Sequence, residues 1–181
     1  MFRDSYSNGW KNLLYDEYDD DDYYYDEEYY DDDYDDEEVD STHRKKNTMI
    51  FIDAESVSAD HCPRIIGQGK AVGEISEIRY YARQNDQTTA AWKDYAKRYD
   101  IKPILMYGEA EHNKIDNKII KDIRNIYRTN KSIDIFCIVS RDGDFTEIVN
   151  EMRGLKKRVV VFATKNTSEK LRNAASEVKG I

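Results

Sequence analysis

The sequence predicts an α/β domain, with a parallel sheet of about five strands and helices on both faces, preceded by a disordered acidic arm. Strand and helix patterns alternate from residue 48 onward, which is typical of a parallel sheet joined by helical crossovers. Residues 49–53 and 133–139 are almost continuous apolar runs, as expected of strands covered on both faces. We place the arm and a basic linker at 1–46 and the domain at 47–181.

The arm is set apart by its charge. Residues 1–40 hold 18 acidic and two basic residues, whereas residues 41–181 hold 26 basic and 19 acidic residues. The Asp-, Glu- and Tyr-rich stretch 16–40 has too little apolar surface to offset the entropy lost on ordering, so we expect it to be disordered. The domain carries a net positive charge, which favours a polyanionic partner such as nucleic acid. An intramolecular contact of the arm with the basic domain, in competition with nucleic acid, is a further hypothesis.

Within the domain, helical and strand periodicities alternate, with one ambiguous segment at 59–70, where Pro63, Gly67 and Gly69 interrupt a short helical pattern. The expected strands are 49–53, 75–82, 102–107, 133–139 and 158–163, and the expected helices are 88–99, 113–127, 144–154 and 168–178.

Several protein classes are disfavoured by the sequence. The first residues are polar and no run approaches the roughly 20 apolar residues of a membrane span, so we expect a cytoplasmic protein without a signal peptide. The two cysteines and three histidines show no disulfide or zinc spacing. A homodimer remains open as an alternative to a monomer.

Two carboxylates follow the fourth expected strand. Asp142 and Asp144 flank Gly143 in the loop after residue 139, and in open α/β sheets ligands bind beyond the carboxyl ends of the strands. Paired acids repel each other unless a positive charge lies between them, and a hard divalent cation prefers carboxylate oxygen. The alternative is a simple Asp-Gly turn whose second acid caps the next helix.

Two further acids are expected near this loop. Asp53 ends the first strand, which would lie beside the fourth strand at a switch point in the sheet. Asp116 falls inside the apolar stripe of the helix 113–127, where a carboxylate is costly unless it is paired or binds a metal. Asp122 lies at the edge of the same stripe and is a candidate fifth ligand. The alternative for Asp116 is a favourable charge at a helix amino end.

Four convergent aspartates (Asp53, Asp116, Asp142 and Asp144) would form an all-oxygen site suited to Mg²⁺ or Mn²⁺. Phosphodiester hydrolysis is the natural chemistry of such a site. The basic side chains of Lys114, Lys118, Lys121 and Arg141 are candidates for binding the phosphates of a substrate.

Three segments together resemble the NYN domain, a branch of the PIN-like ribonuclease superfamily that includes bacterial uncharacterised and limkain-type proteins. They are IFIDAES at 50–56, KIDNKIIKD at 114–122 and VSRDGDF at 139–145. The resemblance covers roughly residues 47–178. It implies a Rossmann-like sheet and metal-dependent ribonuclease activity on single-stranded or structured RNA. It also implies that the four aspartates are catalytic metal ligands and that Ser140 contacts the substrate or supports the ligands.

The sequence departs from the family pattern at three places. Ser56 stands where the family usually has Asn, and Arg141 where it usually has Gly. A late acidic residue of the family would fall near Ser176, next to Glu177.

Two other functions remain as alternatives. One is a catalytically silent RNA-binding or adaptor module. The other is a Toprim-like enzyme acting on DNA, in which Glu55 would pair with the loop acids and Asp116 would have no role.

Overall fold

A computed structural model describes residues 44–84, 87–107 and 114–181, with the side chain of Lys114 left out. The acidic arm and its expected contact with the basic domain lie outside the described residues. The described elements form a six-stranded sheet with helices on both faces, so the predicted α/β class is confirmed.

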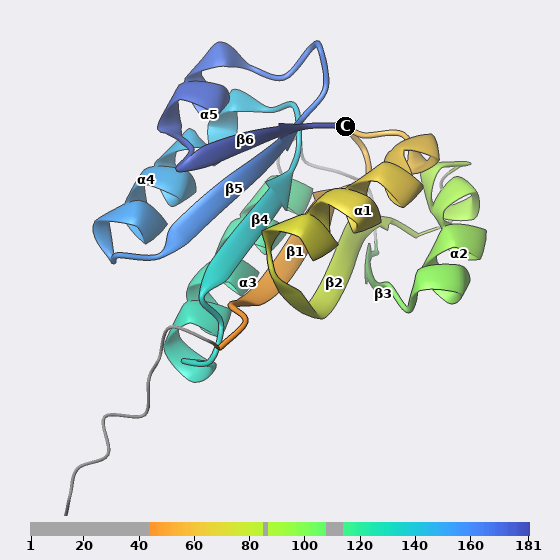
Figure 1. Cartoon of the computed structure of the whole chain (residues 1–181). Helices are drawn as coiled ribbons and strands as arrows, with labels where there is room; N and C mark the ends of the chain where they lie inside the picture. The colour runs from red at the N-terminus through yellow and green to blue at the C-terminus, as the bar shows by residue number, and fades with distance from the viewer. Residues whose placement is uncertain (1–43, 85–86, 108–113) are drawn as a thin grey trace, which may run out of the picture. The chain divides into compact units, whose positions relative to one another are not determined.

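All strand pairings in the sheet are parallel, and the strand order is β3-β2-β1-β4-β5-β6 (Figure 1). β2 and β3 are added on one side of β1, and β4, β5 and β6 on the other, so the order of strand addition reverses at β1. The strands are β1 (Asn47–Asp53), β2 (Glu74–Arg83), β3 (Lys102–Met106), β4 (Ile135–Val139), β5 (Arg158–Ala163) and β6 (Glu177–Gly180).

The helices divide between the two faces of the sheet. α1 (Cys62–Val72) and α2 (Gln87–Tyr99) contribute to one apolar cluster, in which Trp92 stacks on Tyr80 at 5.7 Å between ring centroids. α3 (Lys114–Thr129), α4 (Thr146–Gly154) and α5 (Glu169–Ala174) contribute to the cluster on the opposite face. Two single-turn 3₁₀ helices, η1 (Ala59–His61) and η2 (Gly143–Phe145), begin the connections after β1 and β4.

The sixth strand corrects the predicted helix 168–178. The α5 helix ends at Ala174 because Ala175 has extended backbone angles (φ −66°, ψ 153°), and the chain then pairs with β5 as β6. Val178 lies opposite Val161 in this pairing. The segment EVKG is only four residues long, which is too short for its alternation to stand out from a helical pattern.

The central strands bring two loops together. β1 and β4 pair in register, with Ile52 opposite Val139, so that Asp53 and Ser140 lie next to each other at the carboxyl edge. The predicted proximity of Asp53 to the loop after the fourth strand is therefore confirmed.

Both cysteines are buried and unbonded, Cys62 at the start of α1 and Cys137 in β4. Burial raises the pKa of the Cys62 thiol to about 11, and it raises the pKa of Cys137 further. Among the helices of the described residues, none combines the length and the apolar character needed to cross a bilayer.

The packing of α1 on the sheet can be tested with two glycines of the same helix. Gly67→Ala is expected to raise the free energy of unfolding by about 0.5–1 kcal/mol, because Ala favours the helix and its Cβ meets no described atom within 4 Å. Gly69→Ala would place Cβ 2.6 Å from Cδ1 of Ile50, and overpacking of about 1–3 kcal/mol should outweigh the helix gain. Urea unfolding measures both changes. Equal stabilisation by the two substitutions would contradict this packing.

Candidate metal centre

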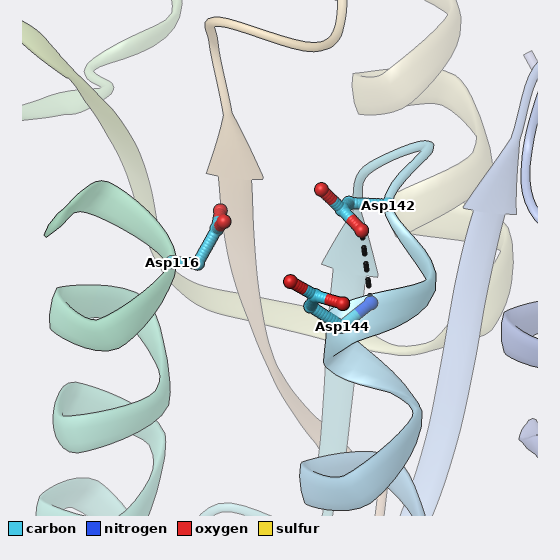
Figure 2. Close-up of side chains that lie close together, drawn as sticks. All are labelled: Asp116, Asp142 and Asp144. Carbon is cyan, nitrogen blue, oxygen red and sulfur yellow. Dashed lines mark hydrogen bonds between the residues drawn. The ribbon is translucent and has the colours of Figure 1, made fainter. Parts of the chain in front are cut away.

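Three carboxylates meet at the carboxyl edge of the sheet. Each of Asp116, Asp142 and Asp144 offers an oxygen atom within 4.8 Å of those of the other two. Figure 2 shows Asp116 reaching across from α3 toward the two loop acids, which come from η2 and the residue before it. Residues distant in the sequence thus converge at one place, as the apolar stripe of α3 and the Asp-Gly-Asp loop predict.

The loop acids are held by local hydrogen bonds. Asp142 is the N-cap of η2, and its Oδ1 accepts a hydrogen bond from the backbone N–H of Asp144 at 2.9 Å. Gly143 allows a close approach to the loop after β5, since a Cβ there would lie 2.8 Å from Oγ of Ser168. The backbone N–H of Ser168 in turn donates to the carbonyl of Arg141 at 2.9 Å. Asp142 therefore both caps a helical turn and faces Asp116.

Asp116 is held in an unfavourable electrostatic environment. Burial, followed by the negative charges of Asp53, Asp142, Asp144 and Glu55, raises its pKa from 3.8 to about 6. Acidic side chains thus face Asp116 from the ends of β1 and β4. A cation placed among them would relieve the repulsion that raises this pKa.

Asp53 lies beside this trio and outside it. Its side chain is buried at the end of β1, and Oδ1 accepts hydrogen bonds from the backbone N–H groups of Glu55 at 3.2 Å and Ser56 at 3.3 Å. Its Oδ2 accepts a 2.8 Å hydrogen bond from the hydroxyl of Ser140. The structure therefore brings three of the four expected acids into one cluster that could hold a metal ion, and it fixes the fourth, Asp53, next to them.

Ser140 links the end of β1 to the loop that carries the two acids. It is fully buried, and besides donating to Asp53 its Oγ accepts the backbone N–H of Asp142 at 3.0 Å. The Oγ of Ser56 lies 3.2 Å from that of Ser140 and also accepts the backbone N–H of Arg141 at 3.2 Å. Because Ser140 is fully buried and its hydroxyl contacts Asp53 and the N–H of Asp142, it lies where it can support the acidic side chains, which is one of the two roles that the family resemblance implies.

Asp122 belongs to a different cluster. Its carboxylate forms an ion pair with Lys118 at 2.6 Å, lies 3.6 Å from Arg79 and accepts a hydrogen bond from Tyr81 at 3.0 Å. This network ties α3 to β2, and the structure does not bring Asp122 into the acidic trio. Lys118, a predicted phosphate ligand, is engaged in the same network. The side chain of Lys114 lies outside the described residues.

Two further charged residues, Arg141 and Glu55, lie around the acidic trio. Arg141 is exposed beside Asp142. Glu55 pairs with Arg83 at 3.0 Å and is one of the charges that act on Asp116. From the sequence, Glu55 was assigned to a site only in the Toprim-like alternative, although its position two residues after the strand-end acid Asp53 was a signal for it.

No late acid joins the site from the C-terminal region of the described residues. Glu177, the nearest match to the family's late acid, pairs with Arg158 and Lys179 at the β5–β6 edge. The hydrogen bonds of Ser56, by contrast, show that this residue links the loops after β1 and β4 although the family usually has Asn there.

The chemistry of the trio fits a hard divalent cation. Three carboxylates on two elements offer only oxygen ligands, which Mg²⁺ and Mn²⁺ prefer, and the two loop acids are exposed to solvent that can complete the coordination. Hydrogen bonds of the loop backbone hold Asp142 and Asp144 in place, so these two carboxylates are positioned without a bound ion.

Comparisons with known proteins identify the family and agree with the fold. The family model of the NYN domain matches residues 47–179. A crystal structure of a protein of unknown function from Vibrio parahaemolyticus has a similar fold, with a TM-score of 0.65 and 20% sequence identity over 77% of this chain and 94% of that chain. Among curated proteins, no similar sequence is found. NYN domains have a PIN-like fold and are generally nucleases, and this chain belongs to the NYN domain family.

Proposed function

We propose that the protein is a metal-dependent endoribonuclease that hydrolyses RNA phosphodiesters at the carboxyl edge of its sheet. The observation that carries the proposal is the convergence of Asp116, Asp142 and Asp144 within 4.8 Å of one another. The raised pKa of Asp116 supports it, since this electrostatic cost has a functional explanation in cation binding. Membership of a family of nucleases supports hydrolysis over a purely structural role.

In the proposed mechanism Asp116, Asp142 and Asp144 would hold Mg²⁺ or Mn²⁺. A divalent ion bound there would activate water for attack and stabilise the charge that develops on the phosphate. Asp53 accepts the Ser140 hydroxyl, and the same hydroxyl accepts the N–H of Asp142, so the chain fixes the loop acids relative to β1. Arg141, exposed beside Asp142, supplies a positive charge for a neighbouring phosphate.

The Toprim-like alternative gains no support from the arrangement of Glu55. That carboxylate pairs with Arg83, and it does not belong to the trio, whereas Asp116 does. The silent RNA-binding alternative is tested by the cleavage experiment.

Asp142→Asn is the sharpest test of the proposed activity. Asn caps a helical turn about as well as Asp, so the fold should persist while one charged ligand is lost. We expect wild-type protein with Mn²⁺ or Mg²⁺ to cleave labelled RNA oligonucleotides, DNA of the same sequence to remain intact, and the variant to be slower by at least about 100-fold.

Asp94→Asn is the matched control, because Asp94 is exposed on α2 and lies outside the trio. Salt-sensitive RNA binding without cleavage in wild-type protein, unchanged or tighter in Asp142→Asn, would favour the silent module. Cleavage of DNA in place of RNA would favour the Toprim-like alternative.

Cation binding can be measured without any substrate. A ligand that binds only the folded state at 100 times its Kd stabilises that state by about 2.7 kcal/mol, so Mn²⁺ should raise the melting temperature of wild-type protein by several degrees. Asp144→Asn should lose most of this increase, and Asp94→Asn should keep it. A metal response that is the same in all three proteins would place the bound ion elsewhere.

The repulsion around Asp116 predicts a pH dependence of stability in metal-free buffer. Asp116 holds its proton up to pH about 6 in the folded state but only to about 3.8 when unfolded, so the folded state loses stability as pH rises through this window. Partial exposure screens the effect to about 1 kcal/mol. Asp116→Asn should therefore be more stable than wild type by about this amount at pH 7, and the difference should vanish near pH 4.

Asp122→Asn is the contrasting variant on the same helix. It removes a carboxylate that already has cationic partners, Lys118 and Arg79, and should lower the free energy of unfolding at pH 7. If denaturant unfolding shows Asp116→Asn to be the less stable of the two variants, the repulsion does not act as described.

A further inference from the structure

A second feature lies across the carboxyl edge from the acidic trio. A cavity of about 670 Å³ opens between the loop after β1, the first turns of α2 and the loop after β5, and we refer to it as the α2 pocket. Its volume falls in the range of small-molecule and cofactor sites. None of the three trio acids lines it, so it is a separate compartment of the same edge.

We propose that the α2 pocket binds one unpaired nucleotide of the RNA strand whose phosphodiester lies at the acidic trio. The proposal rests on the proposed nuclease function and narrows its substrate to single-stranded segments. A base inside a duplex is stacked and paired, and it can enter such a pocket only when it is unpaired.

The lining of the pocket matches the two halves of a nucleotide. Ala54, Val57, Trp92 and Ile181 belong to the apolar cluster beneath it and offer a nonpolar floor for a base. Polar side chains stand around this floor, including Gln87 and Asn166, whose amides can both donate to and accept from base edges.

Two exposed cations, Arg141 and Lys165, line the pocket from neighbouring loops. They come from the loops after β4 and β5, and a phosphate passing over the pocket would meet both of them. Their chemistry favours a polyanionic strand over a neutral ligand.

Two buried polar atoms of lining residues also need a partner. Within the described part of the chain, Nε1 of Trp92 and Oγ1 of Thr164 have no hydrogen-bond partner. Buried polar groups are normally satisfied, so an indole donor and a hydroxyl without partners beside one cavity are consistent with a polar ligand or water there.

Two lining residues, Arg141 and Ser56, connect the wall of the α2 pocket to the loop that carries the trio acids. Arg141 lines the pocket and the next residue, Asp142, belongs to the trio. Ser56 also lines the pocket, and its Oγ accepts the N–H of Arg141 while lying 3.2 Å from Oγ of Ser140. A strand with one base in the pocket would thus have its backbone beside Arg141, next to the loop acids.

Two other cavities lie at the opposite edge of the sheet, near the first residues of its strands. One of about 680 Å³ is lined by Lys45, Lys46 and Lys70, close to the beginning of β1. It is separated from the trio by the length of the strands, whereas the α2 pocket lies at the same edge of the sheet as the trio.

The test compares two adjacent alanines on α2. Both are exposed, but Ala91 lines the pocket and Ala90 does not. In EDTA, where metal-dependent cleavage is prevented, the affinity of the full chain for a fluorescent single-stranded RNA and for its duplex is measured by anisotropy. Wild type should prefer the single strand, and Ala91→Trp should weaken that binding by at least about tenfold, the loss of one base contact. Ala90→Trp should bind like wild type, and duplex binding should be alike in all three proteins.

Lysine substitutions supply an independent measurement should Ala91→Trp fail to fold, as judged by circular dichroism. Lys165→Gln should weaken single-strand binding and reduce its salt dependence, while Lys170→Gln, an exposed lysine of α5 outside the pocket, should do neither. The proposal would be overturned if Ala91→Trp and Ala90→Trp bound single-stranded RNA equally well. If that pair cannot be compared, equal binding by the two lysine variants would overturn it. A wild-type preference for duplex would also overturn it.

Failure of this proposal can be told apart from failure of the nuclease. If RNA is cleaved but the Ala91 and Ala90 variants bind and cut alike, the pocket assignment is wrong and the nuclease stands. If no RNA is cleaved but single-strand binding depends on Ala91, the pocket assignment stands and the catalytic assignment is wrong.

Discussion

The parallel pairing of β1 with β4 is the constraint on which the candidate site depends. It places Asp53 next to Ser140, and the 2.8 Å hydrogen bond between their side chains ties the ends of the two strands together. Ser140 then orients the loop acids through the N–H of Asp142. The buried carboxylate of Asp53 accepts three hydrogen bonds, which offset the cost of its burial. The mutually repulsive acids of the trio lie beside it, and the two loop acids among them are open to solvent and to a cation.

Much of this arrangement could be predicted because the relevant signals are local. The continuous apolar runs of β1 and β4 identify buried parallel strands, and acids at the ends of such strands must lie at one edge. Asp116 was recognisable because it interrupts an apolar helical face. Asp122 lies at the margin of the same face, and periodicity cannot show that Tyr81 and Arg79, which come from β2, already engage it.

The features that the sequence did not predict depend on contacts between distant segments. β6 is a strand because β5 offers it an open edge, which four residues of its own do not reveal. The burial of Ser140 follows from the packing of loops after β1, β4 and β5. The α2 pocket likewise combines side chains from five separate parts of the chain, none of which stands out in the sequence as part of a binding site.

The burial of both cysteines has a practical consequence. With the pKa of each thiol raised by burial, neither side chain is readily converted to the reactive thiolate at neutral pH. These are the two cysteines of the 181-residue sequence, so this chain offers little thiol reactivity of its own. A single cysteine introduced on the surface would then accept a fluorophore or spin label selectively, and distances from it could be followed in solution while ligands are added.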